Sequence, residues 1–207
     1  MYCQNDSFWN KIEECSATCQ DIERYLYSQE YLSLKNPTEY VNIKNIYNTN
    51  LFKYHFDVEK YTNEADYREI YFQGFLDGEI NEKEYYSAEK SFSNLINCLS
   101  YKDNVYVYFD FFVSTENNYP FQKSNDVNFD INFIKDNQGK LIKIVDKSQL
   151  EQISILFARE IVSGYIIFND IKSVLTCSGM HGYILSVNDL NSNLLNNISL
   201  HVSIEKI

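Results

Sequence analysis

The sequence has few of the residues that interrupt regular structure. Proline occurs twice, at Pro37 and Pro120, and glycine six times among 207 residues. No low-complexity run is present, and so few breakers disfavour long linkers between folded parts. We therefore expect a single compact domain over residues 1–207. A subdivision near residue 100, into a helical part (1–100) and a β-rich part (101–207), is the alternative that the change in composition suggests.

The motifs of several large enzyme classes are also missing. The sequence contains no P-loop, no G-x-G-x-x-G after a strand, no H-E-x-x-H and no G-x-S-x-G. Histidine occurs at three positions only, and arginine at three. These absences exclude the nucleotide-binding, zinc-protease and serine-hydrolase classes that the motifs define. We expect no bound cofactor.

Signals for export and for membrane insertion are absent from the sequence. The first residues, MYCQNDSFWNKIEEC, lack the basic segment and apolar core of a secretory leader. No window approaches the roughly 18 consecutive apolar residues of a membrane span. The five cysteines are odd in number and irregular in spacing, unlike a disulfide framework. We expect a cytoplasmic protein without a membrane partner.

An excess of acid and an abundance of tyrosine are what the sequence does contain. Asp and Glu number 29 against 18 Lys and Arg, for a formal net charge of -11, and there are 18 tyrosines. Residues 1–90 hold 17 of the acids, 9 of the bases and 12 of the tyrosines. Because a phosphate-binding face needs clustered Lys and Arg, we expect no nucleic-acid partner.

The first half of the chain has mostly helical patterns. Apolar residues spaced by three and four over 8–26 predict one helix that begins after Asp6 or Ser7 and ends at Asn36-Pro37, with Cys15 and Cys19 on its buried stripe. Similar spacing predicts helices over 63–77 and 81–99. Strands are expected at 41–46 and at 52–58, where apolar and polar residues alternate.

The second half has mostly strand patterns. Residues 105–113 are apolar on both faces, which predicts a central strand. A hairpin is expected from 127–133 and 141–145. A helix should begin near Ser148, bury Leu150, Ile153, Phe157 and Ile161, and end at Ser163-Gly164.

Further strands are expected at 165–168, 182–187 and 198–204. The predicted fold class is α+β, with a helix-rich N-terminal half packed on a mainly antiparallel sheet that the C-terminal half largely forms.

One segment has the residue types of a catalytic site. Cys177 and His181 flank a glycine turn, and a nucleophilic cysteine needs a nearby base. His201 is a candidate third group. The simpler interpretation is a tight turn between strands, with Gly179 and Gly182 at positive φ.

Zinc could also use such residues, because Cys15 and Cys19 form a second short pair. Helical periodicity explains that pair without a metal, and we expect no metal site.

The remaining signal is an acidic, tyrosine-bearing surface in the first half of the chain. Tyrosine offers large contact area, and carboxylates attract basic groups. An ordinary solvated face of two amphipathic helices is the alternative. The candidate partner-binding residues are Glu59, Tyr61, Glu64, Asp66, Tyr67, Glu69, Tyr71, Asp77, Glu79, Glu82, Glu84, Tyr85 and Tyr86.

A small acidic α+β protein without a catalytic motif resembles, in type, a bacterial immunity protein or a similar toxin inhibitor. No family motif is matched, so no family residues carry over. The resemblance implies a cytoplasmic protein that neutralises a basic partner, such as a toxin or nuclease, by occluding its active site. The alternatives are a cysteine-dependent hydrolase or transferase using Cys177 and His181, and a structural or assembly subunit whose late strands form an oligomer interface. Exposure of residues 105–113 would support the assembly alternative.

Overall fold

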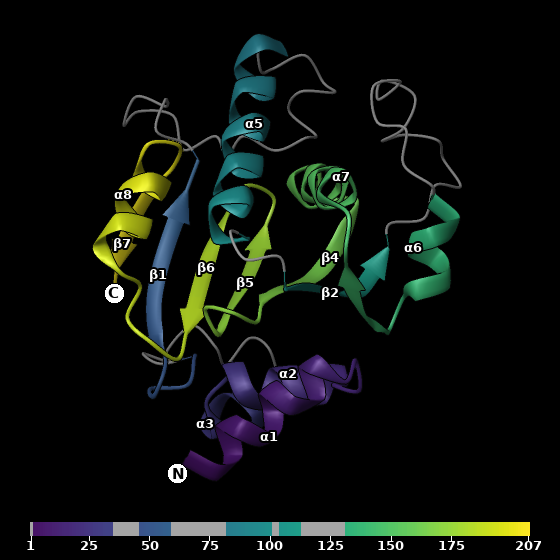
Figure 1. Ribbon diagram of the computed structural model, residues 1–207, viewed down its shortest axis with the longest axis vertical. Coiled ribbons are helices and arrows are strands. Elements are labelled where there is room, and N and C mark those ends of the chain that lie inside the picture. The colour runs from purple at the N-terminus through teal and green to yellow at the C-terminus, as the bar shows by residue number, and fades with distance from the viewer. Residues whose placement is uncertain (1, 35–45, 59–81, 101–103, 113–130) are drawn as a thin grey trace.

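The computed structural model describes residues 2–34, 46–58, 82–100, 104–112 and 131–207 (Figure 1). In chain order its elements are α1 (Tyr2–Glu13), α2 (Cys19–Leu26), α3 (Gln29–Leu32), β1 (Phe52–Asp57), α5 (Glu82–Leu99), β2 (Val105–Phe112), α6 (Ile131–Asn137), β3 (Leu141–Ile144), α7 (Lys147–Ala158), β4 (Val162–Phe168), β5 (Ser173–Ser178), β6 (His181–Ser186), α8 (Ser192–Ser199) and β7 (Ser203–Lys206).

A single seven-stranded sheet organises these elements, in the order β3-β2-β4-β5-β6-β1-β7. Every strand pairing within the described residues is antiparallel. Six strands come from the second half of the chain, while β1 comes from the first half and lies between β6 and β7. The predicted α+β class with a mainly antiparallel sheet is therefore confirmed.

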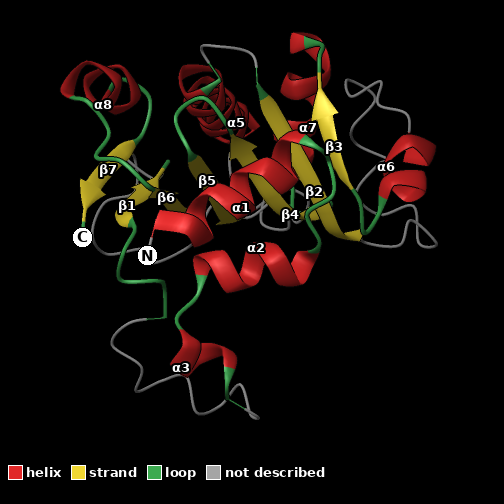
Figure 2. Ribbon diagram, turned by 60° about the horizontal axis from the view of Figure 1, so that its bottom comes forward, coloured by secondary structure: helices red, strands yellow, loops and turns green. Residues whose placement is uncertain are grey.

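Helices cover both faces of the sheet. On one face, residues of α5, α7 and α8 form a core with Val105, Val107 and Phe109 of β2. On the other face, α1 and α2 pack on Tyr106 and Tyr108 of the same strand (Figures 1 and 2). Successive side chains of a strand point to opposite faces, so a strand that is apolar on both faces fits the middle layer. Residues 105–113 were predicted as a central strand, and β2 is an interior strand, flanked by β3 and β4 and second from one edge of the sheet.

The predicted single helix that begins after Asp6 or Ser7 and ends at Asn36-Pro37 is wrong, because the described residues form three helices there, α1, α2 and α3. The helical conformation is interrupted between α1 and α2, where Cys15 has a backbone φ of 52°. Thr18 then caps α2: its hydroxyl accepts a hydrogen bond from the Asp21 N–H, and the Asp21 carboxylate accepts one from the Thr18 N–H. This reciprocal cap starts a new helix. As a result Cys15 is exposed and Cys19 only partly buried, although the predicted stripe buried both.

Two helices were predicted correctly in their buried faces. In α5 the whole apolar face predicted for 81–99 is buried: Tyr85, Ala88, Phe92, Leu95, Ile96 and Leu99. In α7 the residues Leu150, Ile153 and Phe157 are buried as expected. The cap of α7 differs, because Asp146 accepts the hydrogen bond from the Ser148 N–H. Ser163 and Gly164 do not end this helix but lie within β4.

The other differences from prediction are at segments that were predicted as strands and are partly helical in the structure. Residues 131–137 form α6, so β3 pairs with β2 instead of forming the predicted hairpin with 127–133. The predicted strand over 198–204 is divided between the end of α8 and β7. Ile198 and Val202 are both buried. Their separation of four suits a helical turn as well as a strand, which explains the error. The predicted helix over 63–77, and the predicted strand at 41–46 apart from Ile46, lie outside the described residues.

Candidate functional site

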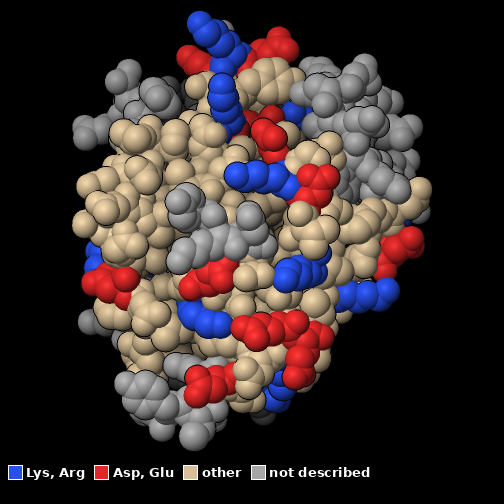
Figure 3. Space-filling model, viewed as in Figure 1, with Lys and Arg blue, Asp and Glu red and all other residues tan. Residues whose placement is uncertain are grey.

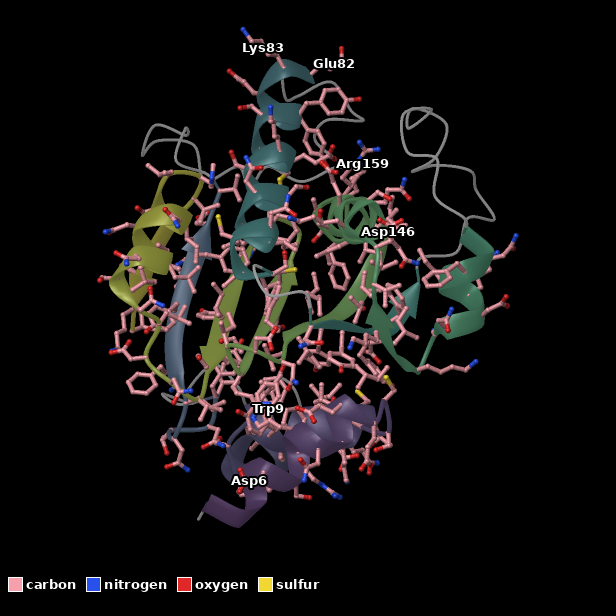
Figure 4. The ribbon with its side chains drawn as sticks, in the orientation of Figure 1. Asp6, Trp9, Glu82, Lys83, Asp146 and Arg159 are labelled. Atoms are coloured by element: carbon pink, nitrogen blue, oxygen red, sulfur yellow. The ribbon has the colours of Figure 1, made fainter. Side chains whose placement is uncertain are left out.

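Most of the predicted acidic, tyrosine-bearing surface lies outside the described residues; this holds for Glu59, Tyr61, Glu64, Asp66, Tyr67, Glu69, Tyr71, Asp77 and Glu79. The four described members belong to α5. Glu82 and Glu84 are exposed on its first turn, and Glu82 is labelled there in Figure 4. Tyr85 is 0 % exposed and packs in the core, while the half-buried Tyr86 has the Arg159 guanidinium 6.0 Å from its ring centroid. Of these four, the two carboxylates are available to a partner.

Many tyrosines serve the interior of the protein instead of its surface. Tyr106, Tyr108 and Tyr165 are buried between the sheet and the pair α1 and α2. At the margin of this layer the rings of Tyr27 and Tyr47 stack, with centroids 5.5 Å apart. Burial raises the pKa of these buried phenols, as expected for groups whose charged form is desolvated. The tyrosine content therefore reflects, in large part, an aromatic core layer.

The hairpin of β5 and β6 separates the predicted catalytic pair. Cys177 lies opposite Gly182, and Ser178 lies opposite His181. Neighbouring residues of a strand point to opposite faces, so Cys177 and His181 lie on opposite faces of the sheet. The packing agrees, because Cys177 contacts the core under α5, α7 and α8, whereas Tyr183, two residues after His181, contacts the core under α1 and α2. The hairpin does not form a thiol–imidazole pair.

The surroundings of Cys177 also disfavour a thiolate. Burial, with a smaller effect from the Glu160 carboxylate, raises the pKa of the Cys177 thiol to about 12. A reactive cysteine needs the opposite environment, one that lowers the pKa. Gly179 has the expected positive φ, of 58°. Gly182 does not have a positive φ. A Cβ at Gly182 would overlap the carbonyl oxygen of Thr176, so glycine is needed there because the two strands approach closely.

Metal-binding groups do not gather in the described part of the chain. No cluster of three or more His, Cys, Asp or Glu side chains with a suitable arrangement occurs there. His201 does not lie on a strand; it lies in the turn after α8, where its Nδ1 is 3.4 Å from Nδ2 of Asn94. Within the same ranges, every helix is too short or too polar to cross a bilayer.

A buried ion pair joins α5 to the end of α7. Arg159 donates from Nε to Oε2 of Glu89 at 2.6 Å and from Nη2 to Oε1 at 3.0 Å. The two residues are 3 % and 6 % exposed. One turn along α5, the hydroxyls of Ser93 and Ser154 are 2.8 Å apart. Such a fork-to-fork pair sets the register between two helices, which is a structural role.

A pocket of about 760 Å³ opens between α5, α8 and the turn that joins β4 to β5. Helices α5 and α8 lie side by side in both ribbon views (Figures 1 and 2). The volume of the pocket falls in the ~300–1,000 Å³ range of ligand pockets. Five of its lining side chains are asparagines: Asn94, Asn97, Asn191, Asn193 and Asn197.

The pocket is polar but carries little charge. Among the described lining residues there is no lysine, no arginine and one carboxylate, that of Asp170, which accepts a hydrogen bond from Nδ2 of Asn104 at 3.1 Å. His201 and Cys98 add a ring nitrogen and a thiol, and burial raises the pKa of the Cys98 thiol. Leu99, Ile171, Leu194 and Leu200 supply apolar wall. The lining can donate and accept hydrogen bonds to a neutral ligand.

Sequence reasoning did not find this pocket. The spacing of Asn94 and Asn97 on a predicted helix was visible, but no element was predicted for residues 192–197, so Asn193 and Asn197 had no assigned face. A helical interpretation of residues 192–199 would have placed these two asparagines one turn apart.

Comparison of the chain with protein families, with curated proteins and with solved structures finds no match. The function must therefore be argued from the residues of this chain alone.

Proposed function

We propose that the protein is an acidic binding protein that neutralises a basic protein partner, such as a toxin or nuclease, by covering its active site. The observation that carries this proposal is the distribution of charge. Residues 59–89 contain nine acids and three bases, a net charge of -6 (3 − 9) out of the -11 of the whole chain. A concentration of one sign attracts a partner of the opposite sign and speeds its association.

Several of the described cations are paired with carboxylates of the same chain, and each pair leaves the net charge unchanged. Lys11 lies 2.6 Å from Asp21, and Lys206 lies 2.6 Å from Asp189. Lys172 lies 3.6 Å from Glu13. Figure 3 shows Asp and Glu at several places on the visible face, with Lys and Arg between them. The described surface is therefore mixed, and the proposed contact rests on the acid-rich segment 59–89.

The two alternatives have less support from the geometry. The thiol and the imidazole that would carry out cysteine-dependent chemistry lie on opposite faces of the sheet. The apolar strand whose exposure would support assembly is β2, and helices cover the described core residues on both of its faces. A binding role needs neither feature.

Affinity capture tests the proposal. The tagged protein is immobilised and exposed to extract of its native cells at low and at high salt. We expect a captured protein with a pI above ~9 that is released as salt rises, because screening weakens charge-driven association. Capture of no partner, or of acidic proteins alone, contradicts the proposal.

A pair of charge-matched variants then locates the contact. One variant neutralises four acids of the candidate segment, with Glu59→Gln, Glu64→Gln, Asp66→Asn and Glu69→Gln. The control neutralises four exposed acids elsewhere, with Glu14→Gln, Asp136→Asn, Glu151→Gln and Glu205→Gln. Binding of the purified partner should weaken at least tenfold more in the first variant. Equal weakening in both would contradict a contact through residues 59–69.

A further inference from the structure

We propose that the pocket between α5 and α8 binds an extended peptide segment by its backbone. The recognising groups are four side-chain carboxamides, those of Asn94, Asn97, Asn193 and Asn197. This inference does not depend on the basic partner proposed above, because it rests on a separate site with different chemistry.

The asparagines form two short rows across the pocket. Asn94 and Asn97 are three residues apart on α5, and Asn193 and Asn197 are four apart on α8. Either spacing places two side chains on one helical face, with Cβ atoms ~5–6 Å apart. Since both helices line the same pocket, a ligand lying in it can meet a row of amides on each side.

An extended peptide backbone suits such rows. It presents a C=O and an N–H at every residue, and groups pointing the same way recur every second residue, at about 6.6 Å. This repeat is close to the spacing of the two amides on each helix. One asparagine side chain can accept a hydrogen bond from a backbone N–H and donate one to a backbone C=O.

The amides are available for such contacts. Within the described part of the chain, the side chains of Asn97, Asn193 and Asn197 make no hydrogen bond to another residue, and Asn94 has its 3.4 Å contact with His201. Asn191 is different, because its side chain caps α8 by accepting from the Leu194 N–H at 2.9 Å. It is therefore left out of the recognising set.

The rest of the lining favours a peptide over other ligands. A phosphate or carboxylate ligand would lack a cation, because no lysine or arginine lines the pocket among the described residues. Among the described lining residues a nucleobase would find no phenylalanine, tyrosine or tryptophan to stack on, and His201 supplies the one aromatic ring among them. Leu194 and Leu200 border the pocket, and Leu200 is 77 % exposed. They can contact apolar side chains of a peptide on either side of its backbone.

Selection from a displayed library of random linear peptides tests the inference. The wild-type protein is compared with the Asn97→Ala/Asn197→Ala variant and with Asn196→Ala as the matched control, since Asn196 is exposed on α8 and does not line the pocket. Alanine is a strong helix former, so the helices should persist, which circular dichroism checks. We expect enriched peptides to bind the double variant at least ~tenfold more weakly and the control unchanged, because two hydrogen-bonding side chains are lost.

Backbone recognition has its own readout. Methylating the amide nitrogens of an enriched peptide should abolish binding, while changing its side chains should have smaller effects. Three results would overturn the inference: no enriched peptide, equal binding to wild type and double variant, or glycan-array binding that the double variant loses. The last result would assign the pocket to a sugar.

Discussion

Single residues matter most where two strands of the sheet approach each other closely. Gly164 of β4 has a φ of 151° and lies beside the irregularity of β2 between Phe109 and Phe111. A Cβ at Gly164 would overlap the backbone carbonyl of Tyr108. By contrast, Gly139 has a φ of 73° with no atom within 4 Å of where a Cβ would lie. A side chain at Gly164 would therefore meet both steric overlap and backbone strain, whereas one at Gly139 would meet backbone strain alone.

We predict that Gly164→Ala lowers the free energy of unfolding by about 3 kcal/mol or more, because the backbone of β2 or β4 must move. Gly139→Ala should cost only ~1 kcal/mol, from the left-handed backbone conformation. Urea unfolding followed by circular dichroism measures both. Similar losses for the two variants would show that the close approach to Tyr108 is relieved without cost.

The thiol of Cys177 should be the slower of two cysteines to alkylate. Its pKa of about 12 leaves almost no thiolate at pH 8, whereas Cys15 is exposed. Peptide mapping by mass spectrometry after brief iodoacetamide treatment should find Cys15 modified first. Faster labelling of Cys177 would restore the case for a reactive cysteine and count against a purely structural role.

Pairs of elements are held together by contacts that are distant in sequence. The Glu89–Arg159 pair joins α5 to α7 across 70 residues, and both charges are almost fully buried. A buried charge that loses its partner is costly, whereas replacing both members by apolar side chains removes the cost.

We therefore expect Glu89→Leu alone and Arg159→Met alone each to destabilise the protein by ~3–5 kcal/mol, and the double variant to lose much less than the sum. Urea midpoints for the four proteins of this double-mutant cycle measure the coupling. Additive losses would mean that each side chain contributes through packing and not through the ion pair.

Local sequence patterns predicted some helices correctly and others incorrectly. Helices α5 and α7 followed from apolar residues at spacings of three and four. The break between α1 and α2 did not, because the apolar stripe of Phe8, Ile12, Ile22 and Leu26 continues across it and all four are buried as expected. The Thr18–Asp21 cap was the signal that opposed this pattern. For α8, an alternation over Ile198–Ile204 obscured a helix that begins at the Asn191 cap.

At the scale of the molecule, the excess of negative charge opposes compactness. At a net charge of -11, folding brings carboxylates closer together and so increases the repulsion between them. Salt screens this repulsion. The layers on both faces of the sheet must outweigh this repulsion through burial of apolar surface.

We predict that sodium chloride raises the thermal unfolding midpoint, measured by circular dichroism from low salt to about 0.5 M, where the Debye length is only a few ångströms. The control variant that neutralises Glu14, Asp136, Glu151 and Glu205, with a net charge of -7 (-11 + 4), should show a smaller rise. A midpoint that falls with salt would mean that the surface ion pairs stabilise the protein more than the excess charge destabilises it.

Local sequence patterns were enough to predict the α+β class, the amphipathic helices α5 and α7, the strands β1 and β2, and the acid excess of residues 59–89. Each depends on residues near one another in the chain, whose periodicity follows from helix and strand geometry. The folded arrangement was needed to show that Cys177 and His181 lie on opposite faces, that many tyrosines line a core layer, and that asparagines of α5 and α8 share a pocket. These outcomes depend on strand pairing and helix packing between distant segments, and the same local pattern is compatible with several such pairings.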